Sequence, residues 1–493
     1  MTCVFESWTR TLSGTMRLVV VSLVLLVLVT AEVPTAADIP EPESAGEPQA
    51  SGLNPDFEAY LEHPPDVSYG YIPPTMDLSH VGAALPAMVE PMALASSFDW
   101  RSEGKVTSVK NQNPCGTCWT FGTVAALESA ALIAEGVTYD FSEQSVALCV
   151  DRTWTYLYDQ ADEPCGLVPG HGGGNSLKAS DVLAMKGAVS ETCNPYNADG
   201  LQCDGSCVCD TCPPVKTVSG YRLVTDDGTQ ESIIKGALTT HGPLVVSFYH
   251  DDAYEYTDGT WGTIYDYYPS PDMANHCVLM IGWNDAVPHP NPSHSGTGAW
   301  IIKNSWGTGH GNGGYGYLAY DSSHTTEIAY LHYKDHEPGE RLLYWDEAGY
   351  VGWYGWENST WMANVFTAPE DGKLSHVEFW TADKDMDYEI YVWSGRFGSQ
   401  VARQSGSTQE FGYYSIPLNA PPSFVSGQQF TIGVKMSGPI AVERALSGVV
   451  DPNIQSNVSF HKNLESHQWQ DLAGRGENAC LRARLTSNVA TNR

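Results

Sequence analysis

The spacing of hydrophobic and polar positions predicts a helical stretch of chain followed by stretches of short strands. Apolar residues recur at helical spacing in four segments, three of which stop at a glycine. The predicted helices are Thr120–Glu135 before Gly136, Glu143–Cys149 after an N-cap at Ser142, Ser176–Lys186 before Gly187, and Gln230–Thr240 before Gly242. Runs of β-branched and aromatic residues then predict strands at Leu244–Tyr249, Cys277–Trp283, Ala299–Lys303 and Tyr315–Tyr320. Residues 96–335 are therefore expected to form one unit, with a helical part and then a β part.

The chain beyond a short linker at Lys334–Glu340 has no helical periodicity. Short strand candidates are separated by turn signals about every 8 to 12 residues, which is the pattern of a β-sandwich. We expect residues 341–486 to form an all-β sandwich domain.

The segment before residue 96 divides into two parts. Arg10 and Arg17 precede Leu18–Val29, twelve residues without a charge, and small residues follow. This pattern is typical of a secretory signal peptide, which we place at residues 1–37. A retained membrane anchor is the weaker alternative, because a helix needs about 20 apolar residues to span a bilayer. Residues 38–95 are rich in proline and acidic side chains, and they are expected to be a propeptide, or a strap along the next domain, or a mobile segment.

The charge of the chain excludes one class of partner. The formal net charge is −33, from 58 acidic and 25 basic residues among 493. A nucleic acid would be repelled, so DNA or RNA binding is not expected. The acidity agrees with three explanations: a surface charge that keeps the protein soluble, a functional anionic surface, or a salty habitat. Composition alone does not distinguish among them.

The chain has twelve cysteines, which fits an exported protein in an oxidising compartment. If Cys3 is removed with the signal peptide and one cysteine is kept as a nucleophile, ten remain for at most five disulfides.

One of these cysteines has the setting of a nucleophile. Cys118 stands at the entrance of a predicted helix, with Gln112 six residues upstream. A thiol is mostly protonated at neutral pH, so a catalytic cysteine needs a helix N-terminus or an imidazolium to hold it as thiolate. His276 opens a strongly apolar strand that would fix its ring, and Asn304, 28 positions further on, would accept from the ring N–H.

The blocks around these residues resemble the papain and cathepsin family of cysteine peptidases. The three signature blocks are Gln112–Trp119, Asn275–Trp283 and Trp300–Gly307, and the likeness covers roughly residues 96–333. It implies an α+β fold, in which a papain-like two-lobed catalytic domain with a helical lobe and a β-barrel-like lobe is followed by the all-β sandwich.

The resemblance also implies a role for each residue. Cys118 would attack the peptide carbonyl, His276 would pair with it and protonate the leaving amine, and Asn304 would orient His276. Gln112 would donate to the oxyanion, and Trp306 would shield the contact between His276 and Asn304. The substrates would be proteins or peptides, the intermediate a thioester acyl-enzyme, and no metal or organic cofactor would be needed.

This chain departs from the family pattern in the glycine-rich strip Gly170–Gly174. His171 stands where a cysteine is expected, so Cys115 loses its usual disulfide partner, and Cys165 is the nearest substitute. Gly173 and Gly174 stay candidates for contact with the substrate backbone, against the alternative of plain loop glycines.

A group of four cysteines lies outside the family pattern. Cys203, Cys207, Cys209 and Cys212 fall within ten residues. They would suit a tetrahedral zinc site, but in an exported chain a disulfide-stapled loop is favoured, with Cys149 and Cys193 nearby. Cys277, beside His276, is expected to be a buried free thiol.

Aromatic residues crowd the start of the C-terminal domain, between Tyr344 and Trp361. They either fill the core or present faces for sugars and partner surfaces. The blocks Trp361–Phe366, Gly427–Phe430 and Asn478–Cys480 are similar to a lectin-like domain appended to papain-like peptidases of some bacteria and archaea. That likeness implies a possible glycan or cell-surface ligand. Asn358 and Asn457 begin weak glycosylation sequons.

The favoured interpretation is a secreted or cell-surface cysteine peptidase. An alternative is an adhesion or carbohydrate-binding protein with a vestigial peptidase unit, which the intact set of Cys118, His276, Asn304 and Gln112 disfavours. A second alternative is an acyl-transferring enzyme such as a transglutaminase. That family would place Asp third, whereas this chain has Asn304.

Overall fold

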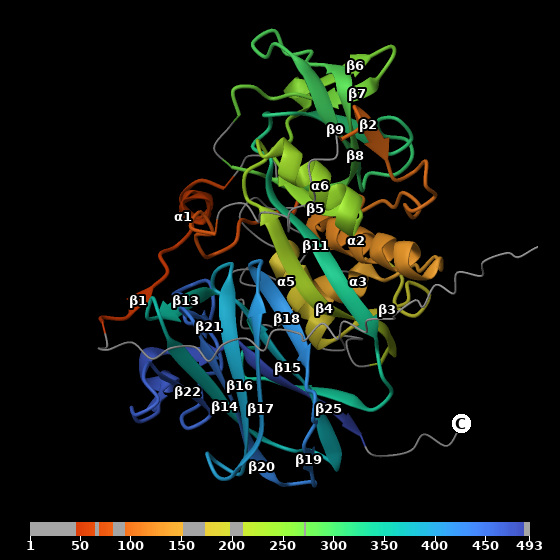
Figure 1. Cartoon of the computed structure of the whole chain (residues 1–493). Coiled ribbons are helices and arrows are strands. Elements are labelled where there is room, and N and C mark those ends of the chain that lie inside the picture. Colours follow the sequence, from red (N-terminus) through yellow and green to blue (C-terminus); the bar gives the residue numbers. More distant parts are fainter. Residues whose placement is uncertain are drawn as a thin grey trace, which may run out of the picture. The chain divides into compact units, whose positions relative to one another are not determined.

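The structure is a computed structural model that describes residues 46–64, 69–81, 94–150, 173–197, 211–270 and 273–487. The predicted signal peptide lies outside these residues. Within them, the helices are α1 (Pro55–Glu62), α2 (Cys118–Glu135), α3 (Glu143–Leu148), α5 (Ser176–Met185) and α6 (Glu231–His241) (Figure 1). None of the described helices is both long and apolar enough to cross a bilayer.

Local signals place the helix ends close to where they are predicted. Gly136 ends α2 in the left-handed conformation, with φ of 70°, which a residue without Cβ adopts at low cost. The Ser142 side chain accepts from the Ser145 backbone N–H and begins α3. Residues 118–129 of α2 are buried on all sides, so this helix is the core of the helical part of the predicted peptidase unit, residues 96–335.

The β part of the predicted peptidase unit is built on two adjacent, strongly apolar strands, β8 (His276–Pro288) and β9 (Thr297–Lys303). They pair in antiparallel register, with Trp283 opposite Trp300 and Met280 opposite Ile302. The strands of this part are β2 (Ser97–Asp99), β3 (Ala188–Val189), β4 (Pro214–Thr225), β5 (Leu244–Phe248), β6 (Glu255–Asp258), β7 (Gly262–Tyr265), β8 (His276–Pro288), β9 (Thr297–Lys303), β10 (Tyr315–Ala319) and β11 (Thr326–Asp335). A helical part and a β part within one unit are thus confirmed.

The C-terminal domain is all β, as predicted, apart from one 3-10 turn at Leu472–Arg475 among the described residues. Apolar side chains from facing sheets, such as Ile390, Ile432 and Leu481, form its core. Its strands are β12 (Glu340–Leu343), β13 (Gly352–Gly355), β14 (Thr360–Thr367), β15 (Gly372–Trp380), β16 (Met386–Ser394), β17 (Gln400–Thr408), β18 (Gly412–Pro417), β19 (Ser423–Phe424), β20 (Gln429–Met436), β21 (Ile440–Arg444), β22 (Ser459–Lys462), β23 (Gln470–Asp471), β24 (Glu477–Ala479) and β25 (Leu481–Ser487).

One sheet runs through both the peptidase part and the C-terminal domain. Strand β18 pairs with β4, with Tyr413 opposite Tyr221, so the order β12-β25-β15-β18-β4-β11-β5-β8 is continuous. The Arg222 side chain donates to the Tyr413 carbonyl and lies 3.4 Å from the centre of the Tyr414 ring. The predicted linker is accordingly only a short turn between β11 and β12.

Buried ion pairs reinforce this junction. Arg482 on β25 is fully buried between Asp181 of α5, at 2.8 Å, and Asp346, at 2.8 Å. Asp181 also accepts from the Trp380 indole N–H at 3.1 Å. On the same strand, Arg484 pairs with Glu378 and donates to the carbonyl of Ala184 in α5. The two parts therefore share a charged, hydrogen-bonded core.

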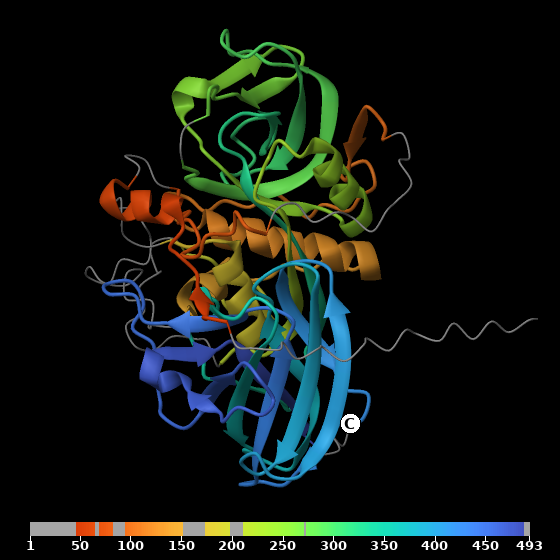
Figure 2. The ribbon, with the colours of Figure 1, turned by 60° about the vertical axis from the view of Figure 1, so that its left-hand side comes forward.

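The N-terminal strap, by which we mean described residues 46–64 and 69–81, packs against both parts. Strand β1 (Gln49–Ala50) pairs with β13 of the C-terminal domain (Figure 2), and Tyr71 bridges to Gly174 of the peptidase. Phe57 and Tyr60 of the short helix α1 are buried. The described residues of this segment therefore lie along both parts of the fold.

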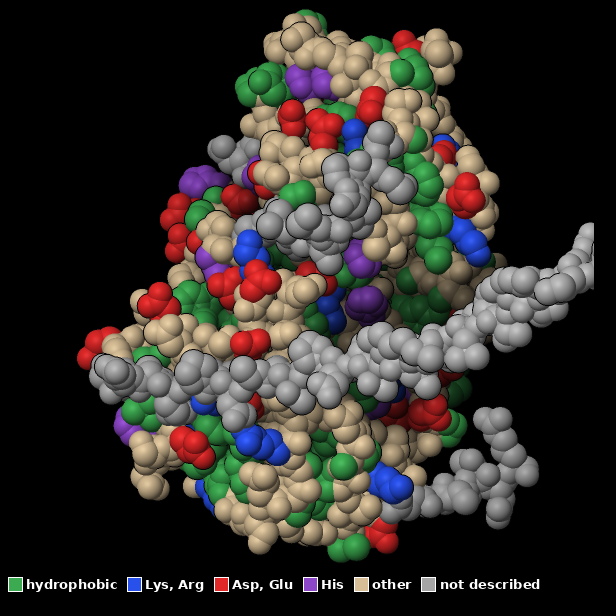
Figure 3. Space-filling model, viewed as in Figure 1, with side chains coloured by type: hydrophobic (Ala, Val, Ile, Leu, Met, Phe, Trp, Pro, Cys, Tyr) green, Lys and Arg blue, Asp and Glu red, His purple; other side chains and the backbone are tan. Residues whose placement is uncertain are grey.

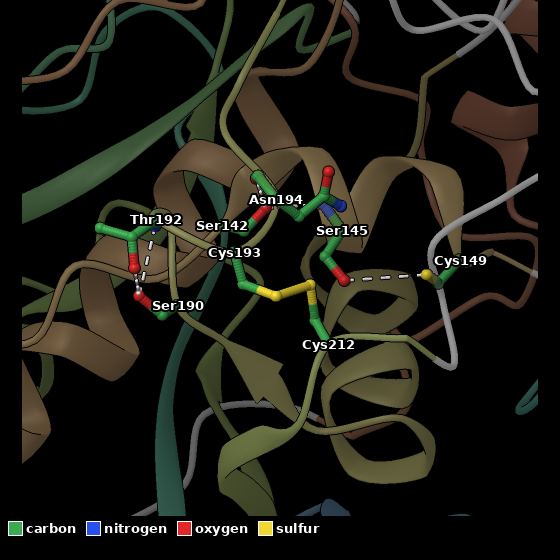
Figure 4. Close-up of a disulfide and its surroundings, with 8 residues drawn as sticks. All are labelled: Ser142, Ser145, Cys149, Ser190, Thr192, Cys193, Asn194 and Cys212. Atoms are coloured by element: carbon green, nitrogen blue, oxygen red, sulfur yellow. Dashed lines mark hydrogen bonds between the residues drawn. A yellow bond between two sulfur atoms is a disulfide. The ribbon is translucent and has the colours of Figure 1, made fainter.

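A disulfide joins Cys193 to Cys212 (Figure 4). Because this disulfide uses Cys212, the alternative in which zinc binds all four clustered cysteines is wrong. The disulfide agrees with the prediction of a disulfide-stapled loop. Cys203, Cys207 and Cys209 lie outside the described residues. Cys115 and Cys149 are also disulfide-bonded, and Cys165, the suggested partner of Cys115, lies outside the described residues. Cys277 is a buried free thiol, as predicted.

Candidate active site

The loop before α2 sets Cys118 at the first position of the helix. The backbone N–H of Phe121 and the hydroxyl of Thr120 both bond to the Thr117 carbonyl, which closes the first turn. The Cys118 side chain is buried, and the backbone N–H groups of Cys277 and Trp119 form hydrogen bonds with its sulfur. Since Cys277 follows His276 directly, the helix start and the start of β8 lie side by side.

His276 opens β8, and Asn304 directly follows β9. His276 Nε2 lies 2.9 Å from Asn304 Oδ1, and because an amide oxygen only accepts, Nε2 is the nitrogen that carries the proton. His276 Nδ1 then remains free to accept a proton, and it has no hydrogen-bond partner among the described residues. The Trp306 ring stacks on His276 at 4.5 Å and 17°, and both His276 and Asn304 are buried.

Gln112 is held in one orientation. Its side-chain oxygen accepts from the Ser305 hydroxyl at 2.6 Å, so its NH₂ group must point the other way. That group donates to the Cys115 carbonyl at 2.8 Å and to the Tyr69 carbonyl at 3.1 Å. The backbone N–H of Cys118 also reaches the Tyr69 carbonyl, at 3.4 Å. Two donors thus converge on one carbonyl oxygen, which belongs to the strap.

The strap continues past Gln112 along the glycines at positions 173 and 174. The Gly174 N–H donates to the Gly70 carbonyl at 2.9 Å, and the Ile72 N–H donates to the Gly174 carbonyl at 2.8 Å. Gly173 has φ of +121°, and a Cβ there would lie 2.4 Å from the Gly70 carbonyl oxygen. Close approach of two backbones therefore requires glycine at this position. His171 lies outside the described residues.

Burial under the strap keeps the central pair uncharged. It raises the pKa of the Cys118 thiol well above its ordinary range, because a thiolate loses its hydration there. For the same reason the pKa of His276 falls to about 3, although the bond to Asn304 opposes the shift. At neutral pH both groups are neutral while the strap is in place.

Sequence reasoning missed a second layer of residues around this pair. The Asn275 side chain accepts from the His250 backbone N–H at 2.7 Å, and the His250 ring lies 3.0 Å from the Tyr69 hydroxyl and packs edge-on to Trp306. The sequence has one feature that indicates the strap contact. It is Tyr69-Gly70, a large aromatic residue followed by a glycine in an otherwise proline-rich segment. Metal-ligating atoms of His250, Asp252 and Glu255 lie within 4.8 Å of one another, but Asp252 is exposed, and His250 Nε2 lies at hydrogen-bonding distance, 3.4 Å, from Glu255.

Comparison with known proteins gives the same picture. Residues 94–334 match the papain family of cysteine proteases, and residues 342–484 match a lectin-like domain. Cysteine proteinase 3 of Entamoeba histolytica is 35% identical over 256 residues, which are 51% of this chain and 69% of that protein. The chain belongs to the papain family of cysteine proteases. The family match confirms the predicted resemblance and enzyme class.

Two further relatives define the extent of the likeness. A cysteine protease of Blomia tropicalis is 30% identical over 230 residues, 46% of this chain, and the match spans 61% of that relative. The crystal structure of the cysteine protease and lectin-like domains of Cwp84, a surface layer associated protein of Clostridium difficile, superposes with a TM-score of 0.73. That structure is 20% identical and covers 90% of this chain and 100% of its own. It confirms the predicted fold, a papain-like domain followed by an all-β domain.

Proposed function

We propose that the chain is an exported cysteine peptidase that hydrolyses peptide bonds at Cys118. The observation that carries this proposal is the Tyr69 carbonyl, which accepts from both the Gln112 side chain and the Cys118 N–H beside the His276–Asn304 pair. A carbonyl held by two donors next to a thiol and an imidazole is the arrangement that acyl transfer requires.

In the proposed mechanism, the Cys118 thiol gives its proton to His276 Nδ1 once a substrate has replaced the strap. The thiolate attacks the substrate carbonyl, whose oxygen becomes the oxyanion held by Gln112 and the Cys118 N–H. The C–N bond then breaks, and His276 gives the proton to the leaving amine. Water, deprotonated by His276, cleaves the thioester to release the acid and restore the thiol. Asn304 keeps Nε2 protonated, so that Nδ1 always faces the reaction.

The strap occupies this site in a direction that prevents its own cleavage. The Tyr69 N–H bonds to the Asn275 carbonyl at 3.3 Å, beside His276, whereas Gly70 pairs with Gly174 on the opposite wall. The nitrogen that would leave from the Tyr69–Gly70 bond belongs to Gly70, so it faces away from the proton donor. We therefore propose that the strap is an inhibitory propeptide whose release activates the enzyme.

Export and surface attachment are part of the same proposal. The apolar run Leu18–Val29 after Arg10 and Arg17, together with the Cys193–Cys212 disulfide, supports passage into an oxidising compartment. The lectin-like match supports docking of the C-terminal domain on a glycan. The face of the molecule seen in Figure 3 has scattered acidic and basic side chains.

Alkylation of the thiols tests the proposal. A site-specific protease sequence placed within residues 82–93 allows the strap to be cut and removed by gel filtration. Iodoacetamide is then expected to label Cys118 and to abolish peptide hydrolysis in the same proportion, as followed by peptide mass mapping. Cys277 and Cys480, which are buried free thiols, serve as internal controls and should stay unlabelled. Full hydrolysis after complete labelling of Cys118 would refute the proposed nucleophile.

Removal of one oxyanion donor should slow the chemical step. Gln112→Ala is expected to lower kcat for a peptide substrate by about 10²- to 10³-fold with little change in KM, because the lost hydrogen bond strengthens only in the transition state. Steady-state kinetics of the strap-free enzyme provide the measurement. Asn113→Ala, next to Gln112 but exposed, is the matched control and should stay close to wild type. An equal rise in KM with unchanged kcat would mean that Gln112 only binds substrate.

Acid should release the strap. The pKa of His276 is about 3 under the strap, compared with an ordinary 6.5, so between these values the strap-free state takes up a proton that the covered state does not. Release is therefore favoured as pH falls through this window, by up to about 1.4 kcal/mol per pH unit. Dissociation of the cut strap, followed by gel filtration between pH 7 and pH 4, measures this. His276→Gln should flatten the dependence, and a pH-independent wild type would contradict it.

A further inference from the structure

A groove of about 440 Å³ lies between the strap and the C-terminal domain, away from the catalytic pair. The strap lines it with Gln49 and His80, and the C-terminal domain lines it with two tryptophans and a cluster of charged side chains. Its volume lies within the roughly 300 to 1,000 Å³ of small-ligand sites. The groove contains part of the aromatic crowd between Tyr344 and Trp361 that catalysis does not use.

Two tryptophans form the aromatic surface of the groove, and the strap holds both. The Trp356 indole N–H donates to the Gly46 carbonyl at 2.7 Å, while the ring stacks on His461 at 5.9 Å and 23°. The Trp353 backbone accepts from Ser51 N–H at 2.9 Å, and its ring packs on His80 at 5.9 Å. His80 in turn lies 2.9 Å from the Ala382 carbonyl. Both rings remain partly exposed to the groove.

The charged lining is predominantly acidic. Glu357, Asp383 and Asp385 line the groove, against one cation, Lys384. Glu357 and Asp385 are exposed. Carboxylates accept hydrogen bonds from hydroxyl and ammonium groups and repel anions. Aromatic faces beside hydrogen-bond acceptors suit a molecule that has apolar ring faces and many donors, which is the chemistry of a sugar.

We propose that this groove binds an oligosaccharide that carries amino groups, with its rings on Trp353 and Trp356 and its ammonium and hydroxyl groups on the three carboxylates. This inference rests on the proposed glycan docking of the C-terminal domain and adds the place, the ligand charge and the dependence on the strap. Because Gln49 and His80 form one wall, the sugar binds the strap-covered protein more tightly than the strap-free protein. By linkage, bound sugar must then stabilise the strap in place to the same degree.

Calorimetry on the full chain tests the proposal with three tetrasaccharides: β-1,4-linked glucosamine, its N-acetylated neutral form, and anionic galacturonate. The glucosamine tetramer is expected to bind best and galacturonate not to bind. Trp356→Ala should weaken binding about tenfold or more. Asp385→Asn, which keeps the shape of the side chain, should weaken the glucosamine tetramer more than the neutral one. His80→Ala should weaken both, and melting temperatures establish that the variants fold.

Trp469→Ala is the matched control, because Trp469 packs on Trp361 and Phe397 away from this groove. It should leave binding unchanged. Loss of binding in Trp469→Ala but not in Trp356→Ala would overturn this groove as the site and leave glycan docking by the domain standing. Binding of none of the three tetramers to the wild-type chain, or equal binding of galacturonate, would overturn the proposal itself. Peptide hydrolysis by the strap-free enzyme is independent of all these outcomes.

Discussion

Cys118→Ala is expected to lower kcat/KM for peptide hydrolysis by on the order of 10⁴-fold or more in the strap-free protein. The substitution removes the sulfur that forms the acyl bond, and only the oxyanion donors and substrate binding would remain to assist attack by water. The strap should still bind, because its contacts with Gln112 and Gly174 do not involve the thiol. Steady-state hydrolysis of a peptide substrate, with folding checked by circular dichroism, is the measurement.

The matched control for this variant is Cys277→Ala, one position after His276. Cys277 is also a buried free thiol, so both substitutions remove one sulfur from the same region. The control should keep its turnover within about threefold and should lose no more than the roughly 1 kcal/mol per methylene-sized group expected of a small buried truncation. If Cys118→Ala kept wild-type turnover, or if Cys277→Ala lost it, the nucleophile would have to be reassigned.

Arg482→Ala is expected to cost about 3 to 5 kcal/mol of unfolding free energy, because it leaves two buried carboxylates without their cation. Asp181 comes from the peptidase and Asp346 from the C-terminal domain, and their side chains are 4% and 0% exposed. Burial already raises the pKa of Asp346 to about 6 despite Arg482. Urea unfolding followed by fluorescence measures the loss, and peptide hydrolysis should disappear in the same transition.

Two further variants are controls for this result. Arg341→Ala removes an arginine that is 67% exposed and paired with Glu370, itself 39% exposed, and it should cost less than about 1 kcal/mol. Arg482→Lys keeps the charge but loses the planar guanidinium that reaches both carboxylates, so an intermediate loss of unfolding free energy is expected. It replaces Arg482→Ala in the measurement if that variant does not accumulate. Two separate unfolding steps in the wild type, with Arg482→Ala affecting neither, would show that the parts are independent.

Local signals carried much of the fold prediction. Gly136 and Ser142 mark helix ends that need only their own side-chain chemistry, and the unbroken apolar run of β8 needs only burial on both faces. The candidate site was predictable in outline because Cys118, His276 and Asn304 each stand at the end of a strong element. Their order along the chain then matched a family pattern.

The rest depends on contacts between distant segments. In the strand Leu481–Ser487, apolar and polar residues alternate, which predicts that Arg482 and Arg484 face solvent, but helix α5 covers that face and both are buried. Strand β4 contains Gly220 and shows no clear period, because consecutive side chains along most of it are buried on both faces of the sheet. The strap has too few apolar residues for its sequence to predict that Phe57 and Tyr60 are buried. Their burial depends on a core that other segments supply.

The sheet that crosses from β4 to β18 has a consequence for exchange of parts between relatives. A peptidase unit transplanted without its own C-terminal domain would expose the edge of β4 and leave Asp181 and Arg222 without the partners they have here. A foreign β domain would have to supply both an antiparallel edge strand and an arginine at the position of Arg482. In this chain the two parts are expected to change together through evolution, and recombination at residues 336–339 should give soluble hybrids only when the second parent supplies both that edge strand and that arginine.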